Sequence, residues 1–338
     1  MKQYKYSTLA NIVERFHKKR LMVIGDLLLD QFIWGEVSRI SPEAPVPVVW
    51  VKDDEFMPGG ACNVANNLAK LGARVSLVGV VGEDETAGIL EGLLKERNIC
   101  TEGIITDREK PTILKTRVIA HHQQVVRIDR ENVNQITGKN LARIQDHIKQ
   151  NIRNVDGVII EDYGKGVITP SLLNIVVPLA KRHGKIIAVD PKENHFSYYK
   201  GVDVITPNHH EAAKAVGFPL DNNETLKRAG ERLVKKLKAE VILLTLGEEG
   251  MMVFEKATPP RRIPTLAQDV FDVSGAGDTV IAVYTLSVIS GGSPIIAAHI
   301  ANCAAGIVVG KVGVTAVGKE ELMDRLRQET VREKRRGT

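Results

Sequence analysis

Short apolar runs recur along the chain and are separated by longer stretches with helical periodicity. Each run is apolar on both faces, which is typical of parallel strands that are covered by helices on both sides. The pattern predicts an α/β fold, a doubly wound and mostly parallel sheet with helices on both faces. The expected strands are 21–26, 75–82, 155–162, 185–190, 202–208 and 241–246, and the expected helices include 61–72, 86–97, 170–183 and 224–238.

Two segments depart from this alternation, at 46–56 and 112–130. Their apolar and polar residues alternate with period two, as in half-buried antiparallel strands. We expect one domain over 1–338 with a small antiparallel β lid, formed by inserted segments at about 34–56 and 112–130. Exposed strand edges that carry Val48, Trp50 and Val126 would invite aggregation unless they are paired, so we expect a homodimer through the lid.

Composition and charge narrow the possible classes of protein. A chain of 338 residues that is 43% hydrophobic can bury a large core, which excludes global disorder. The formal net charge is +5, but the run 325–336 contributes +4 of it. The rest is nearly neutral, so nucleic acid is not an expected partner.

The cysteines and the longest apolar stretches indicate a cytoplasmic protein without a membrane partner. Cys62, Cys100 and Cys303 are odd in number and form no CxxC pair, which fits a reducing compartment. The first apolar run is interrupted by Asp26 and does not read as a secretory signal. The uncharged stretch 279–298 is cut by a Gly-Gly-Ser-Pro turn, which predicts two buried helices.

The strongest local chemical signal is FDVSGAGDTV at 271–280, directly before a long apolar helix. The backbone N–H groups of Gly275, Ala276 and Gly277 would lie at a helix amino terminus, where an anion such as a transferring phosphoryl group is favoured. Asp278 would lie beside that anion and could take a proton from an attacking hydroxyl. The alternative is that Asp278 merely occupies the first helical turn, where acidic residues are common.

The motif DVSGAGDT resembles the carboxy-terminal signature of the ribokinase-like, or PfkB, carbohydrate kinases. The segment PGGACNVANNLAKLGARVSLVGVVG at 58–82 resembles their glycine-glycine motif. The resemblance implies sugar contacts from Gly59, Gly60 and Asn63, and also from Asp30, with Asp26 as a weaker candidate. Taken alone, the glycine pair could equally be an ordinary strand-to-helix turn.

Further along the chain, three motifs resemble the family's nucleotide side. TPNHHEA at 206–212 implies that Asn208 and Glu211 organise Mg²⁺ around the ATP phosphates, largely through water. His209 and His210 diverge on a helix and have no third ligand nearby, so we interpret them as neighbours of the nucleotide and not as a zinc site. The other implied ATP contacts are Thr245, Gly247, Gly250 and Asn302.

The family's usual Asp-Thr before the glycine pair is here Asp272-Val273-Ser274. In relatives this loop borders a monovalent cation, and Asp272 and Ser274 keep oxygen ligands available, so K⁺ dependence is left open. The chain contains neither GxxxxGK[ST] nor GxGxxG, which removes the usual P-loop and dinucleotide-binding alternatives.

A narrower resemblance, to bacterial heptose 7-phosphate kinases in their stand-alone form, is carried by segments 34–49, 115–131, 161–169 and 189–192. It implies that Glu161 contacts the substrate. Arginine and lysine suit a phosphorylated sugar, and Lys165 and Lys192 are preferred because they follow strand ends. Any single one could be a solvated surface charge. The basic candidates are Arg39, Lys115, Arg117, Arg127, Lys165 and Lys192.

These resemblances imply an ATP-dependent phosphotransferase with Asp278 as base and the anomeric hydroxyl of D-glycero-β-D-manno-heptose 7-phosphate as acceptor. The product would be the 1,7-bisphosphate, used for ADP-heptose and lipopolysaccharide. Two alternatives stay open: a kinase for ribose or fructose 6-phosphate, and a catalytically silent relative that binds sugar phosphate.

Overall fold

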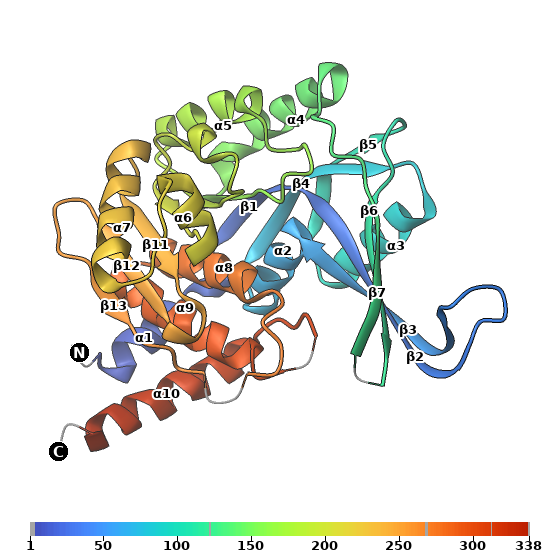
Figure 1. Cartoon of the computed structure of the whole chain (residues 1–338). Helices are drawn as coiled ribbons and strands as arrows, with labels where there is room; N and C mark the ends of the chain where they lie inside the picture. Colours follow the sequence, from blue (N-terminus) through green and yellow to red (C-terminus); the bar gives the residue numbers. More distant parts are fainter. Residues whose placement is uncertain (1–3, 122, 268–269, 312, 337–338) are drawn as a thin grey trace.

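A nine-stranded sheet runs through the centre of the protein in the computed structural model, which describes residues 4–121, 123–267, 270–311 and 313–336 (Figure 1). Seven strands are parallel, and two antiparallel strands complete one edge, in the order β13-β12-β11-β10-β9-β8-β1-β4-β5. This confirms the predicted fold class. The strands are β1 (Arg20–Gly25), β4 (Arg74–Gly82), β5 (Cys100–Asp107), β8 (Gly157–Glu161), β9 (Ile186–Asp190), β10 (Val204–Ile205), β11 (Val241–Thr245), β12 (Met251–Glu255) and β13 (Arg261–Ile263).

Two hydrophobic layers cover the two faces of this sheet. In β1, Leu21 and Val23 face one layer while Met22 and Ile24 face the other, as alternation along a strand requires. The first layer contains α1 (Tyr6–Val13), α2 (Ala61–Lys70), α3 (Glu85–Glu96), α8 (Ala276–Ile289), α9 (Pro294–Val308) and α10 (Lys319–Arg336). The second contains α4 (Gly138–Asn151), α5 (Pro170–Arg182), α6 (His209–Val216) and α7 (Asn223–Leu237). Short 3₁₀ turns lie at Phe16–Lys18, Ile152–Asn154, Phe196–Tyr198 and Gly247–Glu249.

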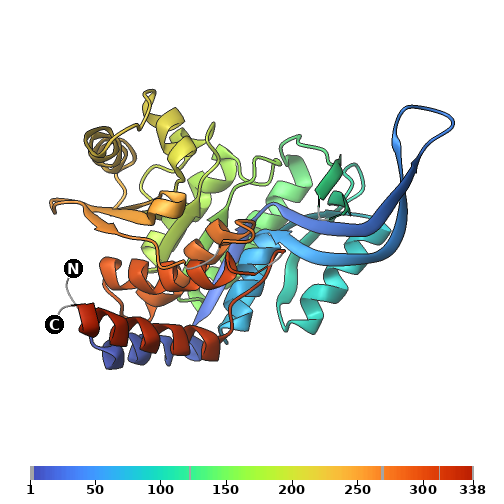
Figure 2. The same cartoon turned by 60° about the horizontal axis from the view of Figure 1, so that its bottom comes forward.

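A separate four-stranded sheet, the lid, stands off the main body, and its longest hairpin reaches away from it (Figure 2). Its order is β3-β2-β6-β7, and both outer pairs are antiparallel as expected. The central pair, β2 with β6, is parallel. The first lid strand begins at Leu27, earlier than the predicted lid start near 34. The strands are β2 (Leu27–Ile40), β3 (Pro47–Gly60), β6 (Ile113–Ala120) and β7 (Gln123–Arg130).

The apolar stretch 279–298 forms parts of α8 and α9, joined by a turn as expected. Among the described residues, no helix is both long and apolar enough to cross a bilayer. All three cysteines are free thiols, of which Cys100 alone is exposed.

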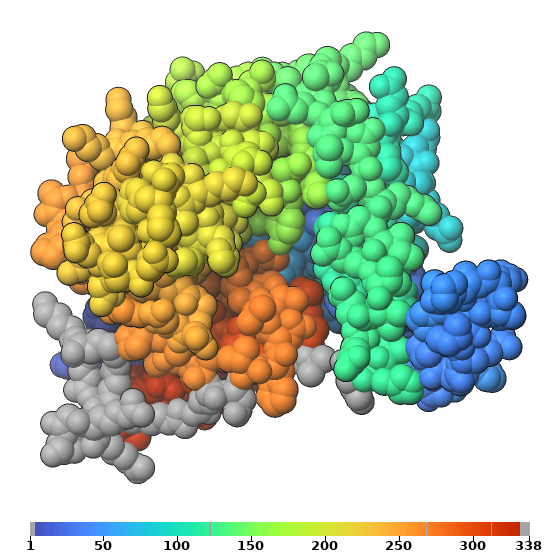
Figure 3. Space-filling model, viewed as in Figure 1, coloured from blue at the N-terminus to red at the C-terminus, as the bar shows by residue number. Residues whose placement is uncertain are grey.

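The carboxyl ends of the central strands form the floor of the functional region. Gly25, Glu161 and Asp190 lie in one register row across β1, β8 and β9. Ligands of open α/β sheets bind at this edge, outside the carboxyl ends of the strands. In the space-filling view, the surface is hollowed between the lid and the main body (Figure 3).

Candidate active site

Asp278 lies in the first turn of α8 and is almost fully buried. Its Oδ2 accepts a hydrogen bond of 2.6 Å from Asn63 Nδ2, and its Oδ1 accepts one of 3.1 Å from the Tyr163 hydroxyl. Burial raises the pKa of Asp278 to about 6, although these two hydrogen bonds oppose the shift. A carboxylate with this pKa is ionised near neutral pH and is still basic enough to accept a proton.

The turn that precedes α8 explains the two glycines of the motif. Gly275 has a φ of +75°, a conformation that glycine adopts without strain. A Cβ at Gly275 would come within 2.9 Å of Asn63 Nδ2 and would displace the amide that contacts Asp278. Ala276 and Gly277 follow in the first helical turn, so the three predicted amides are arranged beside the carboxylate, at a helix amino terminus.

Glu161 and Asp190 approach Asp278 from the ends of β8 and β9. The three carboxylates each offer an oxygen within 4.8 Å of the others. Glu161 is fully buried, and neither of its oxygens has a hydrogen-bond partner among the described residues. Burial, followed by the charges of Asp190 and Asp278, raises the pKa of Glu161 well above its usual value. Carboxylates this close do not all ionise unless a cation joins them.

The predicted sugar-side residues meet Asp278 at the root of the lid. Asp30 on β2 is buried and pairs with Arg117 on β6, and its charge also raises the pKa of Asp278. Gly59 lies opposite this pair, because a Cβ there would overlap the Asp30 carboxylate. Gly60 has a φ of +55° and leads directly into α2, whose first turn carries Asn63. The structure thus brings Asp30, Gly59, Gly60 and Asn63 together.

Asp26 is the candidate that the structure places in another role. Its carboxylate is fully buried and accepts backbone N–H bonds of 2.9–3.0 Å from Tyr163, Lys165 and Val167. These bonds fix the loop after β8, so Asp26 supports the site from behind. Burial is the main cause that raises the pKa of Asp26, to about 6.

Among the basic candidates, Lys115 and Lys165 are linked through one carboxylate, whereas Arg127 and Arg39 lie at the periphery. Glu131 joins Lys115 of the lid (3.5 Å) to Lys165 of the loop after β8 (2.6 Å). Arg127 is half exposed and pairs with Asp129 on its own strand. Arg39 is exposed near the far end of the β2–β3 hairpin and is not brought to the site.

Lys192 lies between the loop after β8 and helix α6. A Cβ at Gly164 would come within 3.2 Å of the Lys192 side chain. Burial raises the pKa of Glu211, whereas the positive charge of Lys192 opposes that shift, so the two groups are neighbours. Lys192 is therefore close to a residue of the predicted nucleotide side.

A cavity of about 410 Å³ lies on the other side of the α8 turn. It is lined by four of the predicted ATP contacts together with the start of α8. Asn302 donates from its side chain to the Pro264 carbonyl at 2.7 Å and so holds one wall. Gly250 has a φ of +88°, and any side chain there would overlap the backbone at 263–265. The predicted residues in the lining are Thr245, Gly247, Gly250, Asn302, Ala276 and Gly277.

Asn208 and Glu211 form a reciprocal cap at the start of α6. Asn208 Oδ1 accepts from the Glu211 N–H at 3.0 Å, and Glu211 Oε2 accepts from the Asn208 N–H at 2.8 Å. The Glu211 charge also raises the pKa of Asp190, after burial, which places the two carboxylates near each other. His209 contacts the Leu220 carbonyl at 2.9 Å, and its ring is perpendicular to that of His210.

Asp272 stabilises the loop before α8 through two hydrogen bonds to backbone N–H groups. One Asp272 oxygen accepts from the Ser274 N–H at 2.9 Å, and the other accepts from the Gly313 N–H at 3.2 Å. The Asp272 carboxylate therefore links this loop to the segment after α9.

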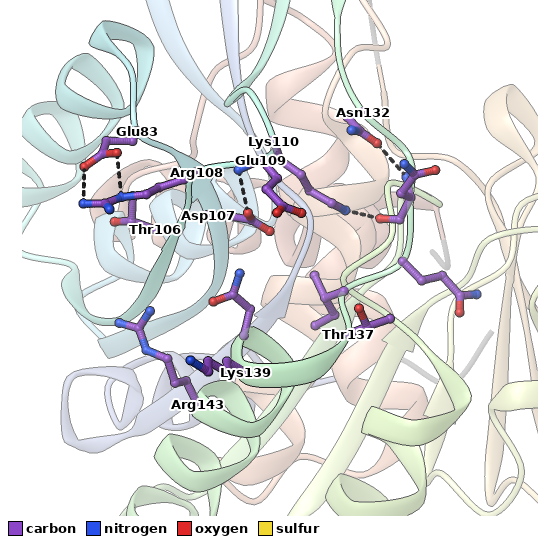
Figure 4. Close-up of a pocket in the computed structure, with 14 residues that line it drawn as sticks. Glu83, Thr106, Asp107, Arg108, Glu109, Lys110, Asn132, Thr137, Lys139 and Arg143 are labelled. Atoms are coloured by element: carbon purple, nitrogen blue, oxygen red, sulfur yellow. Dashed lines mark hydrogen bonds and ion pairs between the residues drawn. The ribbon is translucent and has the colours of Figure 1, made fainter.

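A larger cavity of about 890 Å³ lies at the edge formed by β5 and the start of α4 (Figure 4). It contains none of the predicted site residues. Its cations are partly satisfied within the protein, because Arg108 pairs with Glu83 and Lys110 donates to the Asn134 carbonyl. This cavity is therefore separate from the residues around Asp278.

Tyr163 and Asp190 belong to the site, although the motif analysis assigned neither. Tyr163 directly follows the predicted strand 155–162, and Asp190 ends the predicted strand 185–190. The carboxyl ends of neighbouring parallel strands meet at one edge, so this position could have identified them. Their contacts with Asp278 depend on the fold and could not be deduced from spacing.

Comparisons with known proteins point to one family. Residues 18–321 match the pfkB family carbohydrate kinases. Bifunctional protein HldE of Desulfatibacillum aliphaticivorans is 46% identical over 94% of this chain and 65% of its own length. The HldE protein of Geobacter sulfurreducens is 45% identical over 90% of this chain and 62% of its length. The chain thus spans slightly less than two thirds of these relatives.

Solved structures show the same fold at low identity. The ribokinase of Arabidopsis thaliana, solved with ribose and ATP, superposes with a TM-score of 0.72 at 20% identity and covers 91% of this chain and 99% of its own. Phosphofructokinase-2 of Escherichia coli, solved with potassium, gives 0.75 at 16% identity, covering 92% of this chain and 99% of its own. Together with the family match, they show that the chain belongs to the pfkB family of carbohydrate kinases and is an ATP-dependent sugar kinase.

Proposed function

We propose that this kinase phosphorylates the anomeric hydroxyl of D-glycero-β-D-manno-heptose 7-phosphate and yields the 1,7-bisphosphate. The resemblance of segments 34–49, 115–131, 161–169 and 189–192 to heptose 7-phosphate kinases supports this substrate. Identities of 45–46% to bifunctional HldE proteins support it further, although the chain matches only part of their length. The proposed pathway is cytoplasmic ADP-heptose synthesis for lipopolysaccharide.

The single observation that carries the proposed phosphoryl transfer is the environment of Asp278. Its carboxylate is buried, oriented by Asn63 and Tyr163, and placed beside the amides at the start of α8. In the proposed reaction, Asp278 accepts the proton of the sugar hydroxyl as the oxygen attacks the γ-phosphorus of ATP. The N–H groups of 275–277 hold the charge that develops on the phosphoryl oxygens.

The acidic groups beside this site fit a hydrated divalent cation. Glu161 has unpartnered buried oxygens, and Asp190 lies next to both Asp278 and Glu211. We propose that Mg²⁺ is held, largely through water, by Asn208, Glu211 and Asp190. When bound, Mg²⁺ neutralises charge on the ATP phosphates. Replacing K⁺ by Na⁺ in the assay tests whether the 272–274 loop uses a monovalent cation.

The lid supplies the proposed contacts for the distal phosphate. Lys115, Arg117 and Lys165 lie on segments that meet at the sugar side, and each is paired with a carboxylate. A sugar phosphate can replace those carboxylates as the anionic partner. Lys192, next to Glu211, is the candidate that bridges the sugar phosphate side and the ATP phosphates.

The lid also carries apolar side chains that are left in solvent. Trp50 and Ile128 are 68% and 57% exposed, and β3 and β7 are edge strands. We propose that a second copy of the chain covers this surface and forms a homodimer, because long exposed edges otherwise recruit other strands.

ATP turnover against a panel of acceptors tests the proposed function. The panel holds heptose 7-phosphate, unphosphorylated heptose, ribose and fructose 6-phosphate, with the product located by NMR. We expect the highest kcat/KM for heptose 7-phosphate and a new phosphate at the anomeric carbon. A preference for ribose or fructose 6-phosphate would assign that sugar as the substrate in place of heptose 7-phosphate. Binding without turnover would favour a catalytically silent relative.

A further inference from the structure

Tyr163 reaches Asp278 from a loop that is fixed on two sides. Asp26 accepts the backbone N–H groups of Tyr163, Lys165 and Val167. From the other side, Asp162 accepts the Gly164 N–H at 2.8 Å. These bonds fix the backbone of the loop, from which the Tyr163 hydroxyl donates to Asp278.

Asp162 is itself held in place by neighbouring side chains. The Tyr199 hydroxyl donates to it at 2.6 Å, and the His195 ring contacts it at 2.8 Å. The Gly166 carbonyl accepts from the Ile136 N–H at 2.9 Å, which ties the loop to the segment before α4. These contacts hold the loop from the side of Asp162 and from the segment before α4, so it is supported at several points.

The hydroxyl of Tyr163 is a hydrogen-bond donor to the base. The nearby Asp278 charge, and then burial, raises the pKa of the Tyr163 phenol well above its usual value, so the hydroxyl keeps its proton. Asn63 donates to the other oxygen of the same carboxylate. Two donors from different elements, one on each oxygen, fix the rotation of the carboxylate about its Cβ–Cγ bond.

We infer that Tyr163 is a positioning residue for the catalytic base, held in place by the buried Asp26 carboxylate. This inference rests on the proposed role of Asp278. The tyrosine orients the free lone pairs of Asp278 toward the attacking sugar hydroxyl, because a base works only in the correct geometry. Tyr163 does not contact the reacting phosphoryl group in this arrangement and transfers no proton itself.

The test is a double-mutant cycle with Tyr163→Phe and Asp278→Asn. We expect Tyr163→Phe to lower kcat about 10-fold and to leave the KM for ATP within about twofold, because it disturbs the base and not the nucleotide cavity. In the Asp278→Asn background, the same change should alter kcat less than about twofold, because no base remains to be positioned.

Tyr284→Phe is the matched control. Tyr284 is a buried tyrosine on α8, and its hydroxyl has no hydrogen-bond partner among the described residues. Its kcat should equal that of the wild type. Thermal melting of all variants identifies any that fail to fold. Tyr163→Leu then replaces Tyr163→Phe, and Asp278→Ala replaces Asp278→Asn, in the cycle.

The outcomes separate the inference from the proposed function. Equal 10-fold losses in both backgrounds would show that Tyr163 acts independently of Asp278 and would overturn the inference. An unchanged kcat for Tyr163→Phe would do the same. If Asp278→Asn kept normal kcat, the role of Asp278 itself would fail, whatever Tyr163 did.

Discussion

The main sheet and the lid surround the same opening but treat charge in opposite ways. At the edge of the main sheet, Glu161 and Asp278 are buried, and burial raises the pKa of each carboxyl. On the lid side, partial burial is outweighed at Glu131 by Lys165 and Lys115, which together lower the pKa of that carboxyl. Desolvated acids suit proton transfer, whereas paired charges suit recognition of an anion. Buried acids and paired charges are thus carried by different groups of residues around the opening.

Replacing the base should have the largest effect on activity, because it removes one of the buried acids. Asp278→Asn should lower kcat by at least about 10²-fold, the low end for losing a general base, while ATP binding persists. Steady-state kinetics with nucleotide titration measure both quantities. Asp146→Asn, on the exposed face of α4, serves as a control and should be neutral. Near-normal kcat in a folded Asp278→Asn protein would show that another group is the base.

Removing a cation from the proposed phosphate contacts should affect substrate choice instead. Losing a charge-assisted contact to a substrate phosphate costs about 2–5 kcal/mol, so acceptors that lack the distal phosphate should be poorer by roughly 30-fold in kcat/KM. Lys165→Met or Lys192→Met should reduce this difference between acceptors, because each lowers kcat/KM for the phosphorylated sugar alone. Lys149→Met on α4 is the matched control. Equal kcat/KM for ribose and heptose 7-phosphate would remove the specificity assignment and leave the kinase assignment intact.

The outer surface of the lid should govern association. Trp50→Lys is expected to weaken the proposed homodimer at least about 10-fold, since it places a charge in an apolar contact. Val331→Lys on α10 also changes an exposed apolar residue and should leave association unchanged. Sedimentation at several concentrations measures the dimer affinity of both variants and of the wild type. A wild-type chain that stays monomeric at micromolar concentration would contradict the lid dimer.

The smallest effect concerns stability. Burial raises the pKa of Asp278 to about 6 from 3.8. Between these values the folded protein keeps a proton that the unfolded chain releases, so its free energy of unfolding falls as pH rises from about 4 to 6. Asparagine has no such penalty but makes weaker hydrogen bonds, so Asp278→Asn should be more stable by about 1 kcal/mol above pH 6.

Denaturant unfolding of both proteins in Mg²⁺-free buffer at pH 4 and pH 8 tests this sign. The stability advantage of the Asp278→Asn variant should vanish at pH 4, because Asp278 in the folded wild-type protein is then protonated and carries no buried charge. An equal difference at both pH values would show that the buried charge is not its cause.

Local patterns predicted six strands of the main sheet because these strands are short, apolar on both faces and bounded by turns. Strand β5 at one edge, and β12 and β13 at the other, were not predicted. The start of the lid was missed at Leu27, since LLL at 27–29 is a continuous apolar run and the alternating pattern begins later. The sequence offered Asp26 only as the weaker candidate for a sugar contact. Only the fold shows that its oxygens accept from the N–H groups of Tyr163, Lys165 and Val167. Motifs locate chemical groups, but contacts across long sequence separations decide which partners those groups have.

The lid is joined to the active site without an intervening linker. Strand β2 begins one residue after Asp26, and β3 ends at Gly60, where α2 begins and soon presents Asn63. Bending the lid at its root would therefore displace both the support of the Tyr163 loop and a donor to the base. Length variation should be tolerated only at the far turn, 41–46, while an insertion at either root should inactivate a protein that still folds. The two ends of the lid hairpin at Leu27 and Gly60 are thus part of the catalytic centre itself.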